Sequence, residues 1–351
     1  MRIIVTGATG NVGTSVIAAL GADPGVTEIV GIARRRPRLQ AARTTWVAAD
    51  VANAPLAELF RDADAVIHLA WLIQPSRDER ETYAVNVAGT QRVFDAAAAA
   101  GVGALVHASS VGAYSRGPDD RAVDESWPTE GTPTSFYSRH KVMAERALDA
   151  LETAHPELRV VRLRPALIFK REAASGIRRL FAGPLLPSPL LRPALLPVLP
   201  LPAGLRVQGV HSHDVGEAYR LAATDGRARG AYNVAADPVL DAATLGRALD
   251  ARVVNLPVTV VRAAAALSWQ ARLQPTSPGW LDMGMAVPVL DSGRIRRELG
   301  WTPRHAADAA LLELMAGMRD SAGAPTPPLE PRAGGPLRIR ELVTGLGGRS
   351  R

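Results

Sequence analysis

The first half of the chain alternates short apolar runs with amphipathic stretches. The apolar runs, which have the length and β-branched content of buried strands, lie at residues 2–6, 28–33, 46–49, 65–69, 105–108 and 158–163. Between them, apolar residues at helical spacing predict helices over 12–20, 81–100 and 138–154. Buried strands that alternate with helices are typical of a parallel sheet covered on both faces. We therefore predict an α/β protein built on a doubly wound parallel sheet.

The pattern changes after Pro165, where Pro- and Leu-rich segments, further helices and one lone apolar run at 207–210 follow. We therefore expect the chain to divide into three parts. Residues 1–168 form the sheet domain, whose sheet is completed by parts of 205–235, and residues 169–320 form a smaller, mainly substrate-binding region. Residues 321–351, rich in Pro, Gly and Arg, form a loosely ordered tail.

The composition argues against several classes of function. Hydrophobic residues make up 47% of the 351 residues, enough for a large core, and the net charge is +7. Aromatic residues are only 5%, so the arginines lack the interleaved aromatics of a nucleic-acid surface, and we expect no nucleic-acid partner. The segment 184–202 is apolar but holds seven prolines, so we expect no membrane span.

The chain contains no cysteine, which excludes disulfides, thiolate catalysis and thiolate metal sites. The N-terminus enters an apolar strand at once, without the longer apolar region of a signal peptide. A cytoplasmic protein is the expectation that fits both observations.

A glycine-rich turn joins the first strand to the first helix. Gly7, Gly10 and Gly13 stand at the spacing of a dinucleotide-binding turn, in the strand-to-helix context that this motif requires. A residue without Cβ allows the tight turn, and the helix N-terminus then offers free N–H groups to a pyrophosphate. The residues that we expect at the cofactor here are Gly7, Thr9, Gly10, Asn11, Val12 and Gly13.

The end of the second strand bears on the choice of cofactor. A site for NAD places an acidic residue there, whereas this chain has Ala33 followed by Arg34, Arg35 and Arg36. An arginine can clamp a 2′-phosphate, so we predict that Arg34 binds NADP, with NAD as the alternative cofactor and a solvated loop as the alternative role of the arginines.

Two further strand ends are expected to meet the cofactor. Asp50 and Val51 follow the third strand and face the adenine, although Asp50 could equally cap a helix. Leu69 and Ala70 end the fourth strand and would bring their backbone close to the cofactor.

Tyr137 and Lys141 stand four residues apart at the start of a predicted helix, so their side chains share one face. A nearby ammonium favours the phenolate and lowers the pKa of a tyrosine, which suits acid–base work near neutral pH. The pair is notable because Lys141 and Lys170 are the only lysines of the chain. Ser110, at the end of the fifth strand, is expected to hold the substrate oxygen, with Ser109 as its rival.

Together these motifs resemble the extended short-chain dehydrogenase/reductase family, in its NAD(P)-dependent epimerase/dehydratase branch. The matching features, which cover roughly residues 1–318, are the Thr6–Gly13 turn, Ser109-Ser110 with Tyr114, Tyr137 with Lys141, Asn86 in Asn86–Thr90, Arg164-Pro165 and Leu299–Pro303. The resemblance implies a Rossmann-type fold and a nicotinamide cofactor, with Asn86 and Pro165 in the cofactor site. It also implies that Ser110, Tyr137 and Lys141 are catalytic and that Tyr137 and Lys141 contact the cofactor, Lys141 at its ribose. It is compatible with a homodimer.

Some residues depart from the family pattern. Sugar-nucleotide members carry a diphosphate-binding arginine four residues before a histidine, and Val207 takes that place before His211. Arg206 is one step away, which points it to the other side of an extended strand. Lys170 stands where a glycine often follows the sixth strand. His211, His213 and Asp214 raise the question of a metal, but without a third convincing ligand cluster we expect none.

We therefore predict an NADP-dependent oxidoreductase that transfers hydride to or from the carbonyl or alcohol of a small, rather apolar substrate. The first alternative is an NAD-dependent nucleotide-sugar epimerase or dehydratase. A non-catalytic cofactor sensor is the third reading, and the intact Tyr137–Lys141 pair argues against it because a sensor needs no proton donor.

Overall fold

The computed structural model describes residues 1–74, 77–182 and 197–331. Its centre is a seven-stranded sheet with the order β10-β6-β5-β4-β1-β2-β3, in which each neighbouring pair is parallel. The strands are β1 (Arg2–Thr6), β2 (Glu28–Ala33), β3 (Thr44–Ala48), β4 (Ala65–His68), β5 (Ala104–Ala108), β6 (Arg159–Pro165) and β10 (Gly230–Val234). The predicted doubly wound parallel sheet is thus confirmed.

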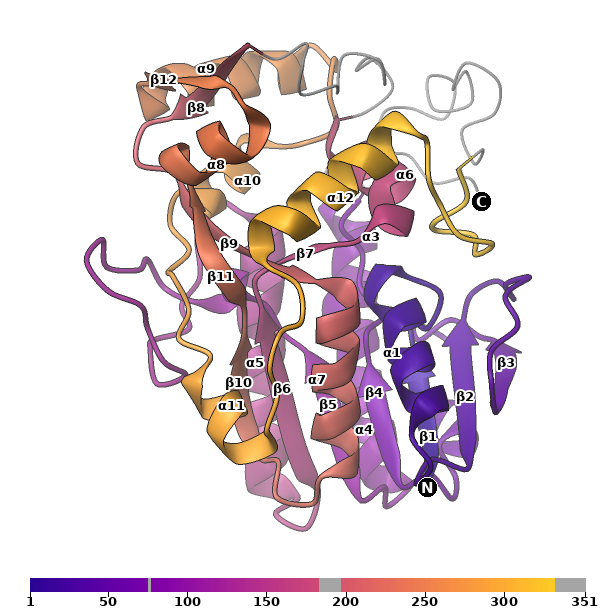
Figure 1. Cartoon of the computed structure of the whole chain (residues 1–351). Coiled ribbons are helices and arrows are strands. Elements are labelled where there is room, and N and C mark those ends of the chain that lie inside the picture. The colour runs from indigo at the N-terminus through magenta and orange to yellow at the C-terminus, as the bar shows by residue number, and fades with distance from the viewer. Residues whose placement is uncertain (75–76, 183–196, 332–351) are drawn as a thin grey trace.

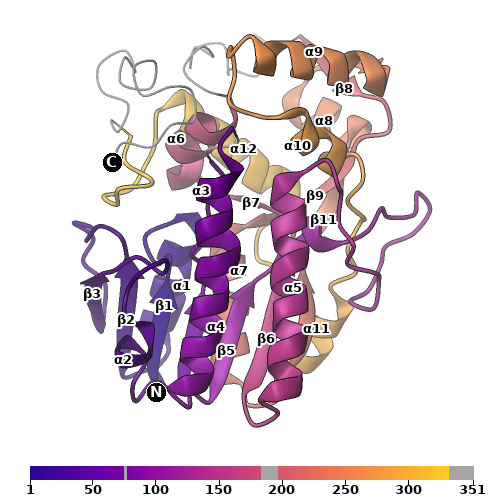
Figure 2. The ribbon, with the colours of Figure 1, turned by 180° about the vertical axis from the view of Figure 1, so that it is seen from behind.

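Helices cover both faces of the sheet. On one face lie α1 (Asn11–Ala22) and α7 (Ser212–Thr224), whose apolar residues share a core with β1 and β5 (Figure 1). On the other face lie α2 (Leu56–Leu59), α4 (Thr90–Ala99) and α5 (Phe136–Ala154), which bury a second core (Figure 2). The strand order reverses between β1 and β4. At such a point the strand ends diverge and leave a crevice at their carboxyl edge, where open α/β sheets bind ligands.

Most predicted elements lie close to where the pattern placed them, but the helix expected over 81–100 is wrong as a single α-helix. The chain forms α3 (Glu79–Tyr83), then a π-helical segment (Ala84–Gly89), and only then α4. A π-helical turn holds an extra residue, so it rotates the side chains that follow relative to those before. The buried Asn86 lies in this segment.

A second lobe covers the carboxyl edge of the sheet (Figure 1). It holds a three-stranded sheet, β11-β9-β7, and a parallel pair, β12-β8. The apolar run at 207–210 is therefore not a lone strand, because it lies in β9 between two partners. The elements of this half are β7 (Leu167–Phe169), α6 (Ala174–Ile177), β8 (Val198–Pro202), β9 (Arg206–His211), β11 (Ala236–Asp241), α8 (Ala242–Leu249), β12 (Arg252–Leu256), α9 (Val258–Gln270), α10 (Pro278–Gly284), α11 (Gly293–Leu299) and α12 (Ala307–Arg319).

Two expectations fall partly on residues that are not described. Of the proline-rich stretch 184–202, which we expected to be a loop, residues 184–196 lie outside the described part and Val198–Pro202 form β8. Of the expected tail, 332–351 lies outside it, whereas residues 321–331 pack on the body with Thr326 and Leu329 buried. In the described ranges, no helix has the length and apolar character needed to cross a membrane.

Candidate active site

The glycine turn after β1 is shaped by close backbone approach. Gly7 has a φ of 71°, and a Cβ there would lie 2.6 Å from the amide nitrogen of Ala70 and 2.7 Å from the carbonyl carbon of Leu69. A Cβ on Gly13 would lie 2.4 Å from the carbonyl oxygen of Gly7. Only glycine fits at these two positions. The turn is thereby pressed against the end of β4, where Leu69 and Ala70 were expected.

Gly10 differs from its two neighbours, because space remains open around it. A Cβ there would meet only the Gly7 carbonyl oxygen, at 3.5 Å. Gly10 is also the N-cap of α1, and within the described chain no side chain caps the helix. Beside it, the side-chain oxygen of Asn11 is buried and has no hydrogen-bond partner among the described residues. Uncapped N–H groups at a helix N-terminus favour an anion, so the turn fits the pyrophosphate of a dinucleotide.

The predicted adenosine-side residues meet at the far end of β2 and β3. Arg34 and Asp50 line the same surface hollow of about 410 Å³. Arg34 is exposed, and Asp50 accepts a hydrogen bond from the Ala52 amide at 3.0 Å. This bond belongs to a turn after β3 and caps no helix, because α2 begins only at Leu56 with Pro55 as its N-cap. Val51 is buried and packs against Gly89, and its side chain does not line the hollow.

Asn86 holds the chain that follows β4. Its side-chain oxygen accepts from the Leu72 amide at 2.7 Å, and its side-chain nitrogen donates to the Leu72 carbonyl at 2.8 Å. Both polar groups of the buried amide are therefore engaged with one residue. Asn86 fixes the path of Leu69–Leu72 and can influence a cofactor through that segment.

The structure brings the three predicted catalytic side chains together. Tyr137 lies in the first turn of α5, which Ser135 caps, and its phenol is hydrogen-bonded with Ser110. Ser110 follows β5 and also accepts from the Gly112 amide at 3.0 Å. Burial raises the pKa of Tyr137 and outweighs the opposing effect of the Ser110 hydrogen bond. The lowered pKa that we expected is therefore not seen in this structure.

Lys141 lies one turn further along α5 and is only 2% exposed. Its ammonium donates to the Ala108 carbonyl at 2.5 Å, lies 3.3 Å from the ring centroid of Trp71, and lies 5.7 Å from the ring centroid of Tyr137. Burial lowers its pKa well below the ordinary value, opposed by the negative charge of Glu145. A carbonyl dipole and an indole face thus take the place of solvent around this ammonium.

Ser109, the rival of Ser110, belongs to a different network. Its hydroxyl donates to Glu145 at 2.5 Å. Glu145 is also buried and is paired with Arg164 at 2.8 Å and with Arg162 at 3.2 Å. Arg164 in turn donates to the Tyr114 hydroxyl at 2.9 Å. Ser109 and Tyr114 therefore help to hold α5 on the sheet, which leaves Ser110 facing Tyr137.

Aromatic rings surround Tyr137, and no spacing along the chain had indicated them. The Trp280 ring lies 4.9 Å from the Tyr137 ring, and the Trp71 ring lies 6.0 Å from it. Phe181 packs edge-on against Trp280 at 5.0 Å. Neither the Trp71 nor the Trp280 indole N–H has a hydrogen-bond partner in the part of the chain that the structure describes. The phenol thus lies in an aromatic cluster that contains two buried indole N–H groups without a described partner.

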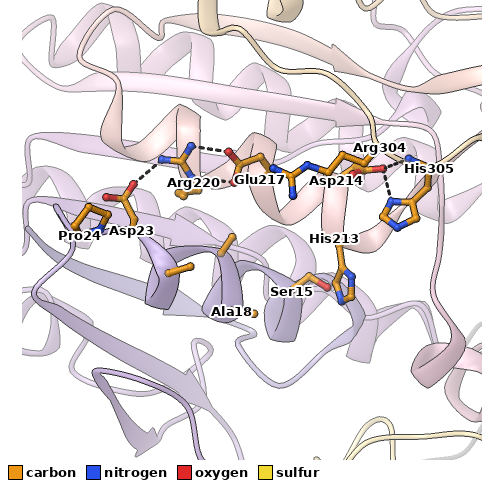
Figure 3. A pocket seen from close by; sticks show the side chains of 12 residues that line it. Ser15, Ala18, Asp23, Pro24, His213, Asp214, Glu217, Arg220, Arg304 and His305 are labelled. Carbon is orange, nitrogen blue, oxygen red and sulfur yellow. Dashed lines mark hydrogen bonds and ion pairs between the residues drawn. The ribbon is translucent and has the colours of Figure 1, made fainter.

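The histidine-containing stretch has a structural role away from Tyr137. Asp214 accepts from the His305 ring at 2.9 Å, and its carbonyl accepts from Trp301 at 2.8 Å, so it ties α7 to the chain before α12. His213 and Asp214 line a hollow of about 660 Å³ between α1 and α7 (Figure 3). Nowhere in residues 1–74, 77–182 and 197–331 do three or more His, Cys, Asp or Glu residues gather in a way that could hold a metal ion.

The arginine beside the family's diphosphate position is engaged elsewhere. Arg206 begins β9 and donates to the backbone carbonyl of Asp119. Val207, in the position itself, packs against the main core. Arg192, the other cation that could reach a phosphate, lies outside the described residues.

The fold and these side chains define a class. A parallel sheet with a glycine turn at its switch point, and a Tyr–Lys pair beside a strand-end serine, is the construction of a nicotinamide-dependent enzyme of the extended short-chain dehydrogenase/reductase type. Residues 3–235 match the profile of the NAD dependent epimerase/dehydratase family, and the chain belongs to that family.

Individual relatives are more distant. The chain is 28% identical over 325 residues to an uncharacterized protein of Mycobacterium tuberculosis; the match covers 92% of this chain and 31% of that protein. It thus spans about a third of the length of the curated relatives first matched. Over 157 residues it is 36% identical to the L-arabinose 1-dehydrogenase (NAD(P)(+)) of Haloferax volcanii, covering 41% of this chain and 58% of that enzyme.

Among solved structures, the UDP-glucose 4-epimerase of Thermus thermophilus in complex with NAD has a similar fold. Its TM-score is 0.64 at 21% identity, and the match covers 91% of this chain and 99% of that one. At this identity the likeness supports the fold alone.

Proposed function

We propose that the chain is an NADP-dependent dehydrogenase or reductase that acts on the carbonyl or alcohol of a small, apolar molecule. The observation that carries this proposal is the pair of indole rings, Trp71 and Trp280, that pack against the Tyr137 ring. They surround the proton-donating group with apolar, aromatic surface.

A nicotinamide cofactor bound at the glycine turn would supply or accept the hydride. In the direction of reduction, the Tyr137 hydroxyl donates its proton to the substrate oxygen. Ser110, which is hydrogen-bonded with that hydroxyl, holds the same oxygen in line with it. Lys141 supplies positive charge beside the phenol and so offsets the charge that Tyr137 acquires on losing its proton.

The choice of NADP rests on the loop after β2. Arg34 lines the hollow at the ends of β2 and β3, and no acidic residue stands at Ala33 to repel a 2′-phosphate. Arg34 is exposed and forms no ion pair with a described residue. Its guanidinium can therefore turn toward a phosphate and bind it with two parallel hydrogen bonds.

The substrate class rests on charge as well as on aromatic surface. Apolar contact with the indole rings stabilises a bound ligand by about 25 cal/mol per Å² of buried surface. A diphosphate would need paired cations to be buried there without a large cost, and Arg206 is directed to Asp119 instead. The rings therefore favour a ketone, aldehyde or alcohol that carries an apolar group.

A nucleotide-sugar epimerase or dehydratase remains the second candidate function. It is supported by the NAD dependent epimerase/dehydratase family to which the chain belongs. In that case Arg206 would have to leave Asp119 for a phosphate.

The decisive experiment compares substrates and a variant. We expect turnover of apolar ketones with NADPH and no binding of UDP in titration calorimetry. Trp280→Ala should raise KM for an apolar ketone by roughly ten-fold, the effect of losing about 50 Å² of apolar contact. Trp269→Ala, a matched removal of an indole that packs on Arg77, should leave KM unchanged. Micromolar UDP binding that Arg206→Ala abolishes would instead establish the second candidate.

A further inference from the structure

The chain doubles back after α12 and returns to the glycine turn. Residues 322–331, which we call the C-terminal hook, form a compact turn in which the Ala324 amide donates to the Leu329 carbonyl at 3.0 Å and the Leu329 amide donates to the Thr326 carbonyl at 3.0 Å. Figures 1 and 2 both show this yellow segment between α6 and the upper ends of β2 and β3. The hook thus lies at the junction of the two lobes.

The tip of the hook touches the two segments that would hold a dinucleotide. The Thr326 hydroxyl donates to the Thr9 carbonyl at 2.9 Å, and Thr326 is only 1% exposed. The Arg38 amide donates to the Pro325 carbonyl at 3.2 Å. Thr9 belongs to the glycine turn and Arg38 to the loop that begins with Arg34, so one short turn connects both.

The base of the hook is fixed to the substrate lobe. The Ser175 hydroxyl donates to the Ala322 carbonyl at 2.8 Å, and the Arg179 guanidinium donates to the Pro328 carbonyl at 2.8 Å. Leu329 is buried. These contacts place the base on α6 and the segment after it, two residues from Phe181 of the aromatic cluster. The tip therefore contacts the sheet domain, and the base contacts the second lobe.

This placement has a consequence for any dinucleotide in the crevice. Its pyrophosphate would rest at Gly10, which follows Thr9, and its adenosine would extend toward Arg34 and Asp50. The hook spans the outside of that path, from Thr9 to Arg38. Both ends of the hook are buried, Thr326 at the tip and Leu329 at the base. Among the described residues, the tip is bonded to the sheet domain by the hydrogen bonds to Thr9 and Arg38 alone, which can break while the base keeps its bonds to Ser175 and Arg179.

We propose that the C-terminal hook is the outer wall of the cofactor site, and that its tip must detach from Thr9 before cofactor enters or leaves. The inference rests on the proposed function only in placing the cofactor at the glycine turn. It holds for NADPH or NADH, and so does not depend on the role of Arg34. The hook slows entry and release together, and the hydroxyl of Thr326 is its latch.

The latch is tested by a matched pair of variants of the full chain. Thr326→Val removes the hydroxyl and keeps the branched shape, whereas Thr326→Ser keeps the hydroxyl. Stopped-flow fluorescence measures binding and release of NADPH and of NADH. We expect Thr326→Val to speed both steps by roughly two- to ten-fold, the effect of losing one neutral hydrogen bond, and Thr326→Ser to stay near wild type. Unchanged release from a folded Thr326→Val protein would overturn the proposal, as would equal effects of Val and Ser.

Hydrogen exchange of the intact chain gives a second, independent measurement. The amides of Arg38 and Leu329 should exchange more slowly when cofactor is bound, and faster in Thr326→Val than in wild type. Exchange that cofactor leaves unchanged at both amides would overturn the proposal. If the chain bound NADH and not NADPH, only the proposed cofactor preference would be contradicted, because the hook could still be tested with NADH. If it bound neither, the proposed function and the proposed role of the hook would both be overturned.

Discussion

Replacing Tyr137 with phenylalanine tests the proton-donating role of its hydroxyl while leaving the fold of the protein intact. The substitution removes one oxygen and leaves the ring packed against Trp71 and Trp280. Loss of the hydrogen bond with Ser110 should change the free energy of unfolding by only about 0.5–1.5 kcal/mol. Loss of a positioned general acid should lower kcat by about 10²–10⁴-fold. The expected result is a folded protein that binds cofactor normally and turns over almost no substrate.

The assay follows NADPH absorbance with an apolar ketone and titrates cofactor by fluorescence. Tyr83→Phe is the matched control, because Tyr83 ends α3 and is 47% exposed. Since burial raises the pKa of Tyr137, loss of the phenol proton should lower the rate of reduction in the wild type only in alkali. Activity of Tyr137→Phe near that of wild type would refute the role given to the hydroxyl.

Three further predictions concern the cofactor and the scaffold. Arg34→Ala should weaken NADPH by about ten-fold or more, the loss of one charge-assisted contact, and leave NADH unchanged; equal effects on both in fluorescence titrations would show that Arg34 is only a surface charge. Glu145→Ala should lower the free energy of unfolding by about 3–5 kcal/mol because Arg162 and Arg164 lose their buried partner, while Glu152→Ala, at a half-exposed partner of Arg162, should cost far less in urea titrations. Burial acts to raise the pKa of Glu145, but Arg164 and Arg162 hold it below 4.5, so its contribution is present above that pH and is lost as the pH falls; in acid the difference from Glu145→Ala should therefore shrink. Gly10→Ala should melt close to wild type but bind cofactor weakly, whereas Gly13→Ala should be destabilised, and the opposite order of melting temperatures would contradict the described turn.

Most strands of the seven-stranded sheet could be predicted from the local pattern of apolar residues. β1 and β2 have the predicted bounds because their apolar runs end at residues that leave the sheet, Gly7 and Arg34. The glycine turn and the Tyr137–Lys141 pair were also predictable, since a strand-to-helix turn and a four-residue helical spacing are local geometry. These features are encoded within a few residues of one another.

The remainder depends on contacts between distant segments. Nothing in the spacing links Trp280 to Tyr137, because α10 reaches α5 only when the second lobe closes on the sheet. The π-helical turn could not be distinguished from an α-helix in the sequence, because it leaves the spacing of the apolar residues nearly unchanged. Its Asn86 side chain is held by the backbone of Leu72, which is distant along the chain. Lys170, which we noted only as a departure, holds the first turn of α1 through Asn11 and Thr14.

The contact between Thr326 and Thr9 also orders events during synthesis of the chain. The two residues are 317 positions apart, so at about 5–20 residues per second the glycine turn leaves the ribosome roughly 16–60 s before its latch exists. Later in that interval, once β1–β6 have left the ribosome, the turn, α1 and the ends of β2 and β3 can fold and meet cofactor without the hook. The nascent chain thus passes through an open form, and the last described segment to emerge converts it to a closed one.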